Sequence, residues 1–586
     1  SPMEVRLACC GILLLFLVRI AADNSYPDHD GNPCCSYPCQ NQGVCITRGY
    51  GYECDCTSTG YTGHYCHIVA DPDGLVKQAE QSFSNLAESF RGNEWLWNIV
   101  NRDSGQRRAY MKKLMLAIAQ ESQPDIYTSA FSFPTMDAYF NRTFYTRYLP
   151  PVAQDCPTPL GVVGRRQLPE IAEVGRRLFA RRRFIPSPVG TNIFFLYFAQ
   201  HLMHIVIRTD ARRGYQFTSG TDHIDNSGTY GQDEAWRQEL RTGRDGKLKT
   251  RFVNGEEWPV SIVEAPVPML RRPYIPEKDI LAVGQDNANP IPFLLMIHVI
   301  WVREHNRVCS ILKWEHPTWG DDQLYETTRF ITTGEMLKIV TEEFIPHIGN
   351  YKFRPLLDPS LLHGDRIRFY HSISYEFSIL FQLHQMVPDC SEVAGRCLAD
   401  REVSYNTSIP LNHGLATLVN STVHQMAGKV GAYNFPNSSY PAALVALNKS
   451  REFRVQPFNE YRKRFNMLPY RSLKELAGGN EQLARDLEEL YGDVDAVEMF
   501  VGMMVEEPRS GLVGDTIARV GLATLLQSVF ANPLMSDRWW RPSTFGGETG
   551  FNIVKGASLQ KLFCLNMDWC PRVSFTVPNT DPLHHR

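Results

Sequence analysis

The feature that most constrains the fold of this 586-residue chain is a cysteine cluster near its start. Seven of the 15 cysteines lie between Cys34 and Cys66, in a stretch that is rich in glycine and turn residues and poor in apolar side chains. A segment of this composition cannot bury enough apolar surface to fold unaided, so disulfides have to hold it together. Because disulfides persist in oxidising compartments, the cluster predicts a protein of the secretory pathway.

The N-terminal segment agrees with that compartment. Residues 3–22 contain a charged start, the apolar run Leu7 to Val18 and two small residues, which is typical of a secretory signal peptide. The apolar run is too short to cross a bilayer comfortably. Sequons without an intervening proline predict glycosylation, with Asn141 and Asn406 as the expected sites and further sequons at Asn420, Asn437 and Asn448.

The cysteine spacing in residues 32–69 resembles that of an EGF-like module. The pattern of such modules implies three disulfides, Cys34–Cys45, Cys39–Cys54 and Cys56–Cys66. Cys35 is then left over, and a bridge to the next luminal cysteine, Cys156, would tie the module to the rest of the chain. We interpret the module as a structural spacer or dimer contact rather than a ligand-binding unit, because its fold alone specifies no activity.

Residues 71–119 are expected to form amphipathic helices. They combine the aromatic residues of WLWNIV with the basic cluster RRAYMKK, as helices that lie in a membrane interface do. Ordinary surface helices are the alternative, because QAEQSFSNLAESF is polar for a membrane-embedded face. From residue 120 to 578, helical periodicity recurs and strand patterns are few, which predicts one large helical body.

The overall charge argues against one class of partner. The chain carries 60 basic and 63 acidic residues, so it has no polyelectrolyte character, and we expect no nucleic-acid partner. With 43% hydrophobic residues, the chain is long enough for one large core and smaller modules.

Two histidine-containing segments suggest where chemistry takes place. In FFLYFAQHLMHIVIRTD, Gln200 and His204 are four residues apart and share a helix face, whereas His201 lies about 100° further round the helix. A histidine one turn from a glutamine, in an aromatic-rich helix, suits a site that moves protons to and from an oxygen bound to a cofactor. Either histidine taken alone is more often a core residue with satisfied hydrogen bonds.

The second segment is SYEFSILFQLHQMVPD, residues 374–389. Its apolar spacing predicts a helix that continues to Pro388 and presents Phe381 and His384 on one face. Zinc is an improbable ligand, because no HExxH or CxxC motif accompanies the histidines. Two apolar helices that each present a histidine to a helical interior suit a flat cofactor, with one histidine bound to iron and the other on the opposite face.

The chain as a whole, from about residue 32 to 578, resembles the prostaglandin G/H synthase (cyclooxygenase) family of animal haem peroxidases. The motifs that carry this resemblance are NPCCSYPCQNQGVC, DCPTPLGV, FAQHLMH, RTDARRG, REHNRVC, HPTWGDDQL, DPSLL, FNEYRKRF, ELYGDVDAVE and RPSTFGGETGF. The implied fold is mainly α, with a large helical haem peroxidase domain that follows a small disulfide-rich EGF-like module and a short amphipathic helical segment. The segment 71–119 is then a candidate monotopic membrane-binding region.

The resemblance implies a complete peroxidase site. His384 matches the proximal ligand of haem b, and His204 with Gln200 matches the distal site at which the O–O bond of a hydroperoxide is cleaved. The expected partners are therefore a hydroperoxide and a small reducing co-substrate. The family also implies a homodimer.

The second activity of the family, the oxygenation of arachidonate, depends on a tyrosine three residues before the proximal histidine. That position is Phe381 in this chain. A phenyl ring has no O–H to lose and cannot form the radical that takes hydrogen from a fatty acid.

Other positions that the resemblance assigns to cyclooxygenase activity also differ. The serine that aspirin acetylates falls on Leu525, and the arginine that binds the substrate carboxylate falls on Ala117. Two further tyrosines near the radical site fall on Phe344 and Phe500, whereas Tyr351 at the channel entrance keeps its type. Each change alone resembles drift between apolar core residues, but four losses around one activity indicate that this activity was given up.

The remaining cysteines and the C-terminus complete these expectations. Cys564 and Cys570 match the C-terminal disulfide of the family, and Cys390 and Cys397 are close enough in sequence to close a small loop. The end of the chain, NTDPLHHR, lacks the retrieval tail of the endoplasmic reticulum that relatives carry. We therefore expect the protein in the lumen or at the membrane surface of the endoplasmic reticulum, or secreted.

The sequence thus predicts a haem-dependent peroxidase that reduces hydroperoxides and has lost cyclooxygenase activity. One alternative is a functional cyclooxygenase that uses a different radical tyrosine. Another is a haem-binding pseudoenzyme or dimerisation partner that acts through its EGF-like module.

Overall fold

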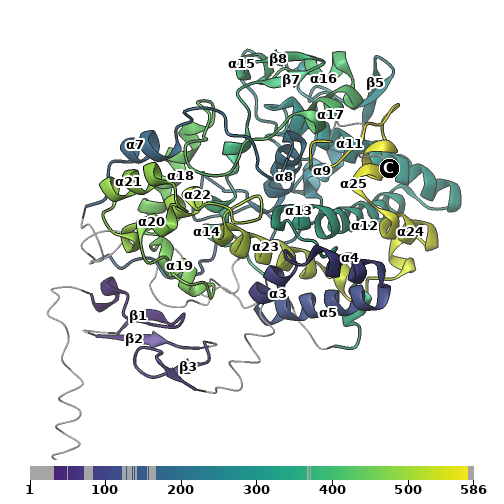
Figure 1. Ribbon diagram of the computed structural model, residues 1–586. Coiled ribbons are helices and arrows are strands. Elements are labelled where there is room, and N and C mark those ends of the chain that lie inside the picture. The colour runs from purple at the N-terminus through teal and green to yellow at the C-terminus, as the bar shows by residue number, and fades with distance from the viewer. Residues whose placement is uncertain are drawn as a thin grey trace, which may run out of the picture.

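A computed structural model describes residues 32–48, 51–57, 59–70, 83–121, 127, 135, 138, 142–154, 156, 167–365, 369 and 371–578. The expected signal peptide, the sequon at Asn141 and the C-terminal NTDPLHHR lie outside these residues. The described part is mainly helical, and its helices surround one large apolar core (Figure 1). The predicted fold class, a mainly α body with a small disulfide-rich N-terminal unit, is confirmed.

The α-helices of the described residues are α3 (Phe83–Ser89), α4 (Glu94–Arg102), α5 (Ser104–Glu121), α7 (Ile171–Val174), α8 (Ile193–Val206), α9 (Ser227–Tyr230), α10 (Glu234–Leu240), α11 (Pro292–Glu315), α12 (Asp321–Ile339), α13 (Ile345–Gly349), α14 (Tyr375–Leu380), α15 (Asp400–Val403), α16 (Ser408–His413), α17 (Leu415–His424), α18 (Tyr440–Glu452), α19 (Phe458–Arg464), α20 (Leu473–Leu476), α21 (Glu481–Leu490), α22 (Met499–Val505), α23 (Asp515–Phe530), α24 (Glu548–Gly556) and α25 (Leu559–Cys564). The strands are β1 (Val44–Arg48), β2 (Gly51–Asp55), β3 (Tyr61–Thr62), β4 (Ile68–Val69), β5 (Thr250–Val253), β6 (Glu256–Pro259), β7 (Ser391–Val393) and β8 (Arg396–Leu398). Consecutive strands pair as four antiparallel hairpins.

The N-terminal unit is a small double hairpin held by disulfides. Strands β1 and β2 pair with Cys45 opposite Cys54, and β3 pairs with β4. The structure forms the bonds that the EGF-like pattern implies, namely Cys34–Cys45, Cys39–Cys54, Cys56–Cys66 and the bridge Cys35–Cys156 to the body. It also forms Cys564–Cys570, which the resemblance implies. The pairing of Cys390 with Cys397, which the sequence left open, is formed as well.

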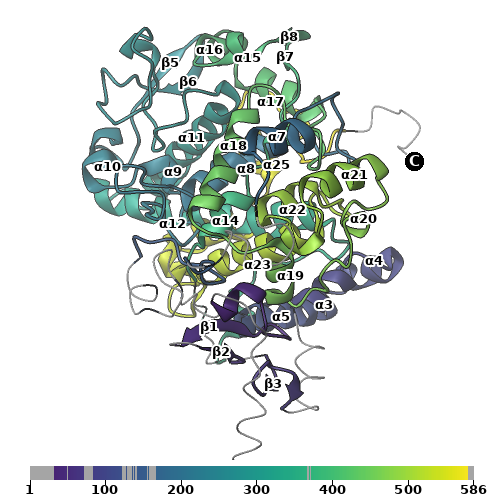
Figure 2. The same cartoon turned by 90° about the vertical axis from the view of Figure 1, so that its left-hand side faces the viewer.

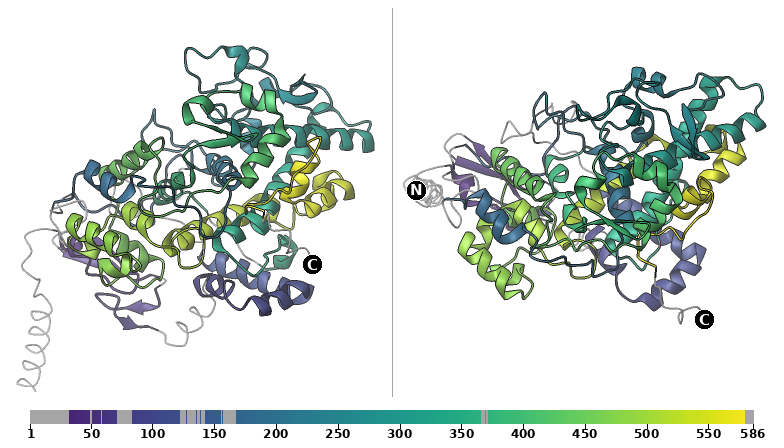
Figure 3. Two further views of the ribbon diagram at one scale, coloured as in Figure 1. Left: turned by 45° about the horizontal axis from the view of Figure 1, so that its top comes forward. Right: turned by 90° about the horizontal axis from the view of Figure 1, so that it is seen from above.

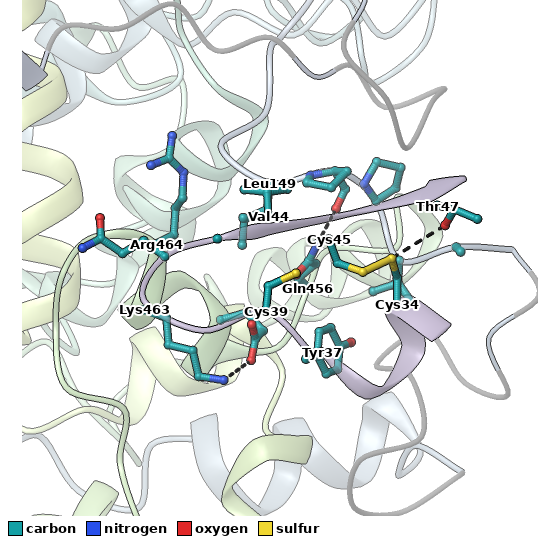
Figure 4. A pocket seen from close by; sticks show the side chains of 17 residues that line it. Cys34, Tyr37, Cys39, Val44, Cys45, Thr47, Leu149, Gln456, Lys463 and Arg464 are labelled. Atoms are coloured by element: carbon teal, nitrogen blue, oxygen red, sulfur yellow. Dashed lines mark hydrogen bonds and ion pairs between the residues drawn. A yellow bond between two sulfur atoms is a disulfide. The ribbon is translucent and has the colours of Figure 1, made fainter. Parts of the chain in front are cut away.

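The N-terminal unit also packs against the body around a cavity of about 40 Å³ (Figure 4). Gln456 donates a hydrogen bond to the carbonyl of Pro150 over 2.8 Å, and Lys463 pairs with Glu460 over 2.6 Å. Burial raises the pKa of Tyr37, and the nearby Glu460 carboxylate raises it further. The unit is therefore joined to the body by the disulfide Cys35–Cys156, and its Tyr37 lies close to Glu460 of the body.

Helices α3, α4 and α5 form a separate layer. They lie below the body in Figures 1 and 2, as the N-terminal unit does, and the view from above separates the two sideways (Figure 3). Trp97 is buried against Phe90, with ring centroids 5.3 Å apart, whereas Trp95 and Ile99 are 67% and 55% exposed. None of the helices in the described ranges is both long enough and apolar enough to cross a lipid bilayer.

Helix α11 forms the centre of the body. Its residues from Pro292 to Asn306 are buried without interruption, and it packs against α8, α12 and α17. Helix α14 packs against α22 and α23 in the neighbouring part of the core. Helix α8 and the end of α14 therefore belong to two groups of core helices, one around α11 and one formed by α14, α22 and α23.

The predicted continuous helix over residues 374–389 is wrong. Helix α14 ends at Leu380, and only a short 3₁₀ turn, His384–Met386, follows. The guanidinium of Arg181 donates to the carbonyls of Gln385 and Val387 over 2.9 and 2.8 Å. These carbonyls are thereby fixed by a residue distant in sequence, so Phe381 and His384 do not share a helix face.

Candidate active site

Helix α8 carries the first half of the candidate site. Its start is fixed by Asn192, whose side chain accepts a hydrogen bond from Phe195 N over 3.1 Å and donates to the carbonyl of Ser574 over 2.8 Å. Of its 14 residues, all are buried except Gln200 and His204. The two side chains that the sequence selected are thus the ones on this helix that stay partly exposed, one helical turn apart.

The second half is the segment after α14. His384 is partly exposed, while the next two residues, Gln385 and Met386, are fully buried. Arg181 holds this segment through the two carbonyl contacts already described and through an ion pair of 2.7 Å with Asp389. The backbone is therefore anchored directly after His384.

The two imidazoles lie close enough to influence each other. Burial, together with the charges of Arg208 and His384, lowers the pKa of His204 to about 4. Burial also lowers the pKa of His384. Both rings are consequently neutral near pH 7, and a neutral imidazole can accept a proton or bind a metal ion.

Buried ring nitrogens mark the two histidines as binding groups. Nδ1 of His204 and Nδ1 of His384 are buried without a hydrogen-bond partner in the part of the chain that the structure describes. Buried polar atoms without a partner are rare in proteins and often indicate a ligand-binding site. The pair suits a flat cofactor held between α8 and the segment around His384.

Sequence analysis missed three residues beside His204. Asn287 lies in the loop before α11, and its Nδ2 is 3.4 Å from Nε2 of His204. Arg208 follows α8 and forms an ion pair of 3.1 Å with Asp286. Asp286 and Asn287 lie in no motif, and Arg208 opens the motif RTDARRG without any sign of its partner, because the two segments come together only in the fold.

His201 does not face the site. Its Nδ1 lies 3.3 Å from Nε2 of His298 on α11, and Nδ1 of His298 contacts the carbonyl of Gly228 over 3.1 Å. Both rings are fully buried, and burial lowers the pKa of both. This pair belongs to the core between α8 and α11, in line with the rotation of His201 away from Gln200.

The residues that the resemblance assigns to cyclooxygenase positions are placed in two groups. Phe381 is 8% exposed and packs against Phe377, with ring centroids 5.4 Å apart. It also lies against Gly521 on α23, where a Cβ would approach its Cε2 to 2.6 Å. Leu525, one turn further along α23, is fully buried. Phe381 and Leu525 thus belong to the same part of the core.

The other assigned positions lie elsewhere in the core. Phe344 stacks on Phe195 of α8 at 5.0 Å, and Phe500 packs against Phe179 at 5.7 Å. Ala117 on α5 is buried. Tyr351 contacts Phe90, and burial raises its pKa to about 12, while the charges of Arg91 and Arg519 act in the opposite direction.

Comparison with known proteins agrees with this arrangement. Residues 208–575 match the family described as animal haem peroxidase. The chain is 41% identical to prostaglandin G/H synthase 2 of Bos taurus over 557 residues, which cover 94% of this chain and 92% of the bovine protein. It is also 41% identical to prostaglandin G/H synthase 1 of Mus musculus over 580 residues, or 97% and 96% of the two chains. The chain belongs to the prostaglandin G/H synthase family of animal haem peroxidases.

Solved structures show how widely the fold is shared beyond this family. The fatty acid alpha-dioxygenase of Oryza sativa superposes with a TM-score of 0.62 at 17% identity, covering 87% of this chain and 99% of that protein. Peroxidase A of Dictyostelium discoideum superposes with a TM-score of 0.61 at 18% identity, covering 74% and 95%. At such identities the likeness concerns the fold alone.

As a member of the prostaglandin G/H synthase family, the chain is an oxidoreductase homologue whose family binds haem. Its own residues fit such a group. The neutral His384 offers a ring nitrogen from a firmly held backbone, and Gln200 and His204 supply polar groups on the facing helix.

Proposed function

We propose that this protein is a haem b-dependent peroxidase of the secretory pathway that reduces hydroperoxides and does not oxygenate arachidonate. The observation that carries the proposal is the burial pattern of α8. Gln200 and His204 alone among its residues remain accessible, and His204 lies close enough to His384 for the two charges to interact. His384 is assigned as the iron ligand, and Gln200 and His204 as the residues that act on the peroxide.

The chemistry of this chain follows from the neutral state of His204. Haem b, when bound to His384, supplies an iron centre for the two-electron reduction of a peroxide. His204 takes the proton from the hydroperoxide O–H and returns it to the departing oxygen, as a general base and then a general acid. Gln200 polarises the two oxygens by hydrogen bonding. A small reducing co-substrate supplies the electrons.

The loss of arachidonate oxygenation is supported by the surroundings of Phe381. Its ring lies within the core beside Gly521, in a position from which a tyrosine hydroxyl would face the same interior. Phe381 has no hydroxyl, and Leu525 adds bulk without polarity one turn away on the same helix. The charge-assisted contact to a substrate carboxylate is absent at Ala117.

Further properties belong to the same proposal. The domain order is a signal peptide at 3–22, an EGF-like module at 32–69, a monotopic membrane-contacting segment at 71–119 and a haem peroxidase domain at 120–578. The exposed Trp95 and Ile99 on α4 support the membrane contact. We propose a homodimer, glycosylation at Asn141 and Asn406, and residence in the endoplasmic reticulum or secretion.

The proposal is tested by the optical spectrum of the purified protein with hemin. We expect a Soret band, and turnover of an organic hydroperoxide with a phenolic reductant. His384→Ala should abolish haem-dependent turnover, whereas His413→Ala, which changes an exposed histidine on α16, should leave it unchanged. A protein that refuses hemin, or a fully active His384→Ala variant, would contradict the assignment.

A functional cyclooxygenase is the second candidate, and one observation favours it. Arg519 on α23 lies near enough to Tyr351 to influence its pKa, so a cation is present although Ala117 carries none. Such a cation can pair with a fatty-acid carboxylate. Oxygen uptake with arachidonate, together with a tyrosyl radical signal in electron paramagnetic resonance, would decide for this candidate.

A further inference from the structure

The side chain of Asn287 reaches His204 from outside α8. Its Nδ2 donates a hydrogen bond to Nε2 of His204 over 3.4 Å. A donor at Nε2 needs the lone pair of that nitrogen, so the ring proton lies on Nδ1. At 3.4 Å this contact is long, so an incoming O–H can replace it at the lone pair of Nε2, and His204 is presented as a base at that nitrogen with Asn287 beside it.

The loop that carries Asn287 is held at both sides. Asp286 pairs over 3.1 Å with Arg208, which follows α8. The side chain of Asn289 exchanges two hydrogen bonds of 2.9 Å with the backbone of Leu281. The ion pair fixes the loop to the end of α8, and the bonds of Asn289 fix it to the segment around Leu281, so the carboxamide of Asn287 is positioned by the fold.

The second polar atom of this carboxamide is unused. Oδ1 of Asn287 is buried and has no hydrogen-bond partner among the residues placed by the structure. A buried acceptor that lacks a donor is costly, so a ligand that brings a donor to it is favoured over one that brings an apolar group. Nη1 of Arg208 is buried and unpartnered in the same way, which adds polarity next to His204.

We propose that Asn287 makes hydrogen peroxide the preferred oxidant of this site, an inference that rests on the proposed peroxidase function. Hydrogen peroxide carries a hydrogen on each oxygen, so one O–H can give its proton to His204 while the other donates to Oδ1 of Asn287. An alkyl hydroperoxide has carbon on its second oxygen and cannot make that bond. In the reaction, the O–O bond breaks, hydrogen peroxide takes up two protons and two electrons from the reducing co-substrate, and two water molecules are formed.

The test compares two oxidants in the haem-loaded full-length protein. The measured quantity is the ratio of kcat/KM for hydrogen peroxide to kcat/KM for tert-butyl hydroperoxide, with the same phenolic reductant. We expect the wild-type ratio to favour hydrogen peroxide and to fall roughly tenfold or more in Asn287→Val, mainly through slower reaction with hydrogen peroxide. Asn552→Val, which replaces an exposed residue on α24, should leave the ratio unchanged.

A second variant and a measurement without turnover complete the test. Asn287→Asp keeps size and acceptor but places a carboxylate beside His204, so the acidic limb of the pH profile should move to higher pH. The affinity for cyanide, measured from the shift of the Soret band, should fall roughly fivefold in Asn287→Val. The variant lacks the carboxamide N–H that donates a hydrogen bond on the ligand side of His204. A residue that only maintains the fold would lower both peroxide rates together.

The outcomes separate the two proposals. If haem-loaded wild type turns over neither peroxide, the peroxidase function itself is wrong. If wild type turns over both, while Asn287→Val keeps the wild-type ratio and cyanide affinity, or Asn287→Asp keeps the wild-type pH profile, the assignment of Asn287 is overturned. If Asn287→Val does not take up haem, the pH profile of Asn287→Asp decides.

Discussion

The surroundings of His204 keep its imidazole neutral, so that it can act as a base. Burial, the guanidinium of Arg208 and the imidazole of His384 all disfavour its charged form, which lowers its pKa to about 4. The same ring in water would be partly protonated at the pH of an acidic secretory compartment. The site can therefore accept a proton over most of the physiological pH range.

Phe381 tests whether a single hydroxyl restores the second activity. Phe381→Tyr adds an oxygen beside Gly521, in a core where a Cβ on that glycine would already come within 2.6 Å of the ring. We expect no oxygen uptake with arachidonate from this variant, because Leu525 and Ala117 still offer the lipid no polar contact. Electron paramagnetic resonance after peroxide addition measures whether a tyrosyl radical forms. Oxygen uptake at more than trace rate would show that Phe381 alone had blocked the activity.

A buried histidine outside the site should make the protein sensitive to acid. Burial lowers the pKa of His305 to about 4, and its Nε2 contacts the carbonyl of Gly246 over 2.8 Å. Since the unfolded chain binds this proton at about pH 6.5, stability is lost as the pH falls from about 6.5 towards 4. His305→Gln should reduce the stability lost between pH 7 and pH 5 by about 2 kcal/mol.

Urea unfolding of wild type and His305→Gln at the two pH values measures that difference. The other buried histidines titrate in the same way in both proteins and cancel in the comparison. An equal loss in wild type and variant would contradict the pKa assigned to His305.

At the scale of elements, the segment around His384 depends on Arg181. This side chain, 6% exposed, donates to the carbonyls of Gln385, Val387 and Asn434 and pairs with Asp389. Such contacts replace the hydrogen bonds that a continued α14 would have made. The position of His384 is thus set by a residue near the π-helical turn Gly175–Phe179, far away in sequence.

Removal of this anchor should weaken haem binding without unfolding the body. In Arg181→Met the carbonyls of Gln385 and Val387 lose their charged donor, which costs about 1.5 to 3 kcal/mol for such bonds. We expect the dissociation constant for hemin to rise roughly tenfold or more. Titration by absorbance measures it, with Arg183→Met, an exposed neighbour, as the control. Equal affinity in both variants would show that His384 is held by other contacts.

The elements of the site show what could be predicted from the sequence and what could not. The face of α8 was correct, because Gln200 and His204 follow from helical spacing within one element. The continuation of α14 was wrong, because its carbonyls are captured by Arg181, and no local pattern reports that contact. Asn287 was missed for a related reason, since its loop reaches His204 only in the fold, where the ion pair between Arg208 and Asp286 helps to hold it.

At the scale of the whole molecule, the bridge Cys35–Cys156 closes a loop with a sequence separation of 121, whereas Cys390–Cys397 closes one of 7. In the chain-entropy account, a longer loop restricts the unfolded chain more, with about 5 kcal/mol for the first bond and about 2 kcal/mol for the second. Replacing both cysteines of the first bond by serine should therefore lower the denaturant midpoint more than the same change at the second. Equal shifts would indicate that the packing of the N-terminal unit against the body, around Tyr37 and Glu460, dominates.

The bridge between Cys35 and Cys156 also encloses helices α3, α4 and α5 in a covalent ring. A protease that cuts the backbone once anywhere inside that ring leaves both fragments attached to each other. Such a nicked molecule keeps its apparent mass on a non-reducing gel and separates into two bands only after a thiol is added. The layer of α3, α4 and α5 can thus be severed along the chain and still remain part of the same particle.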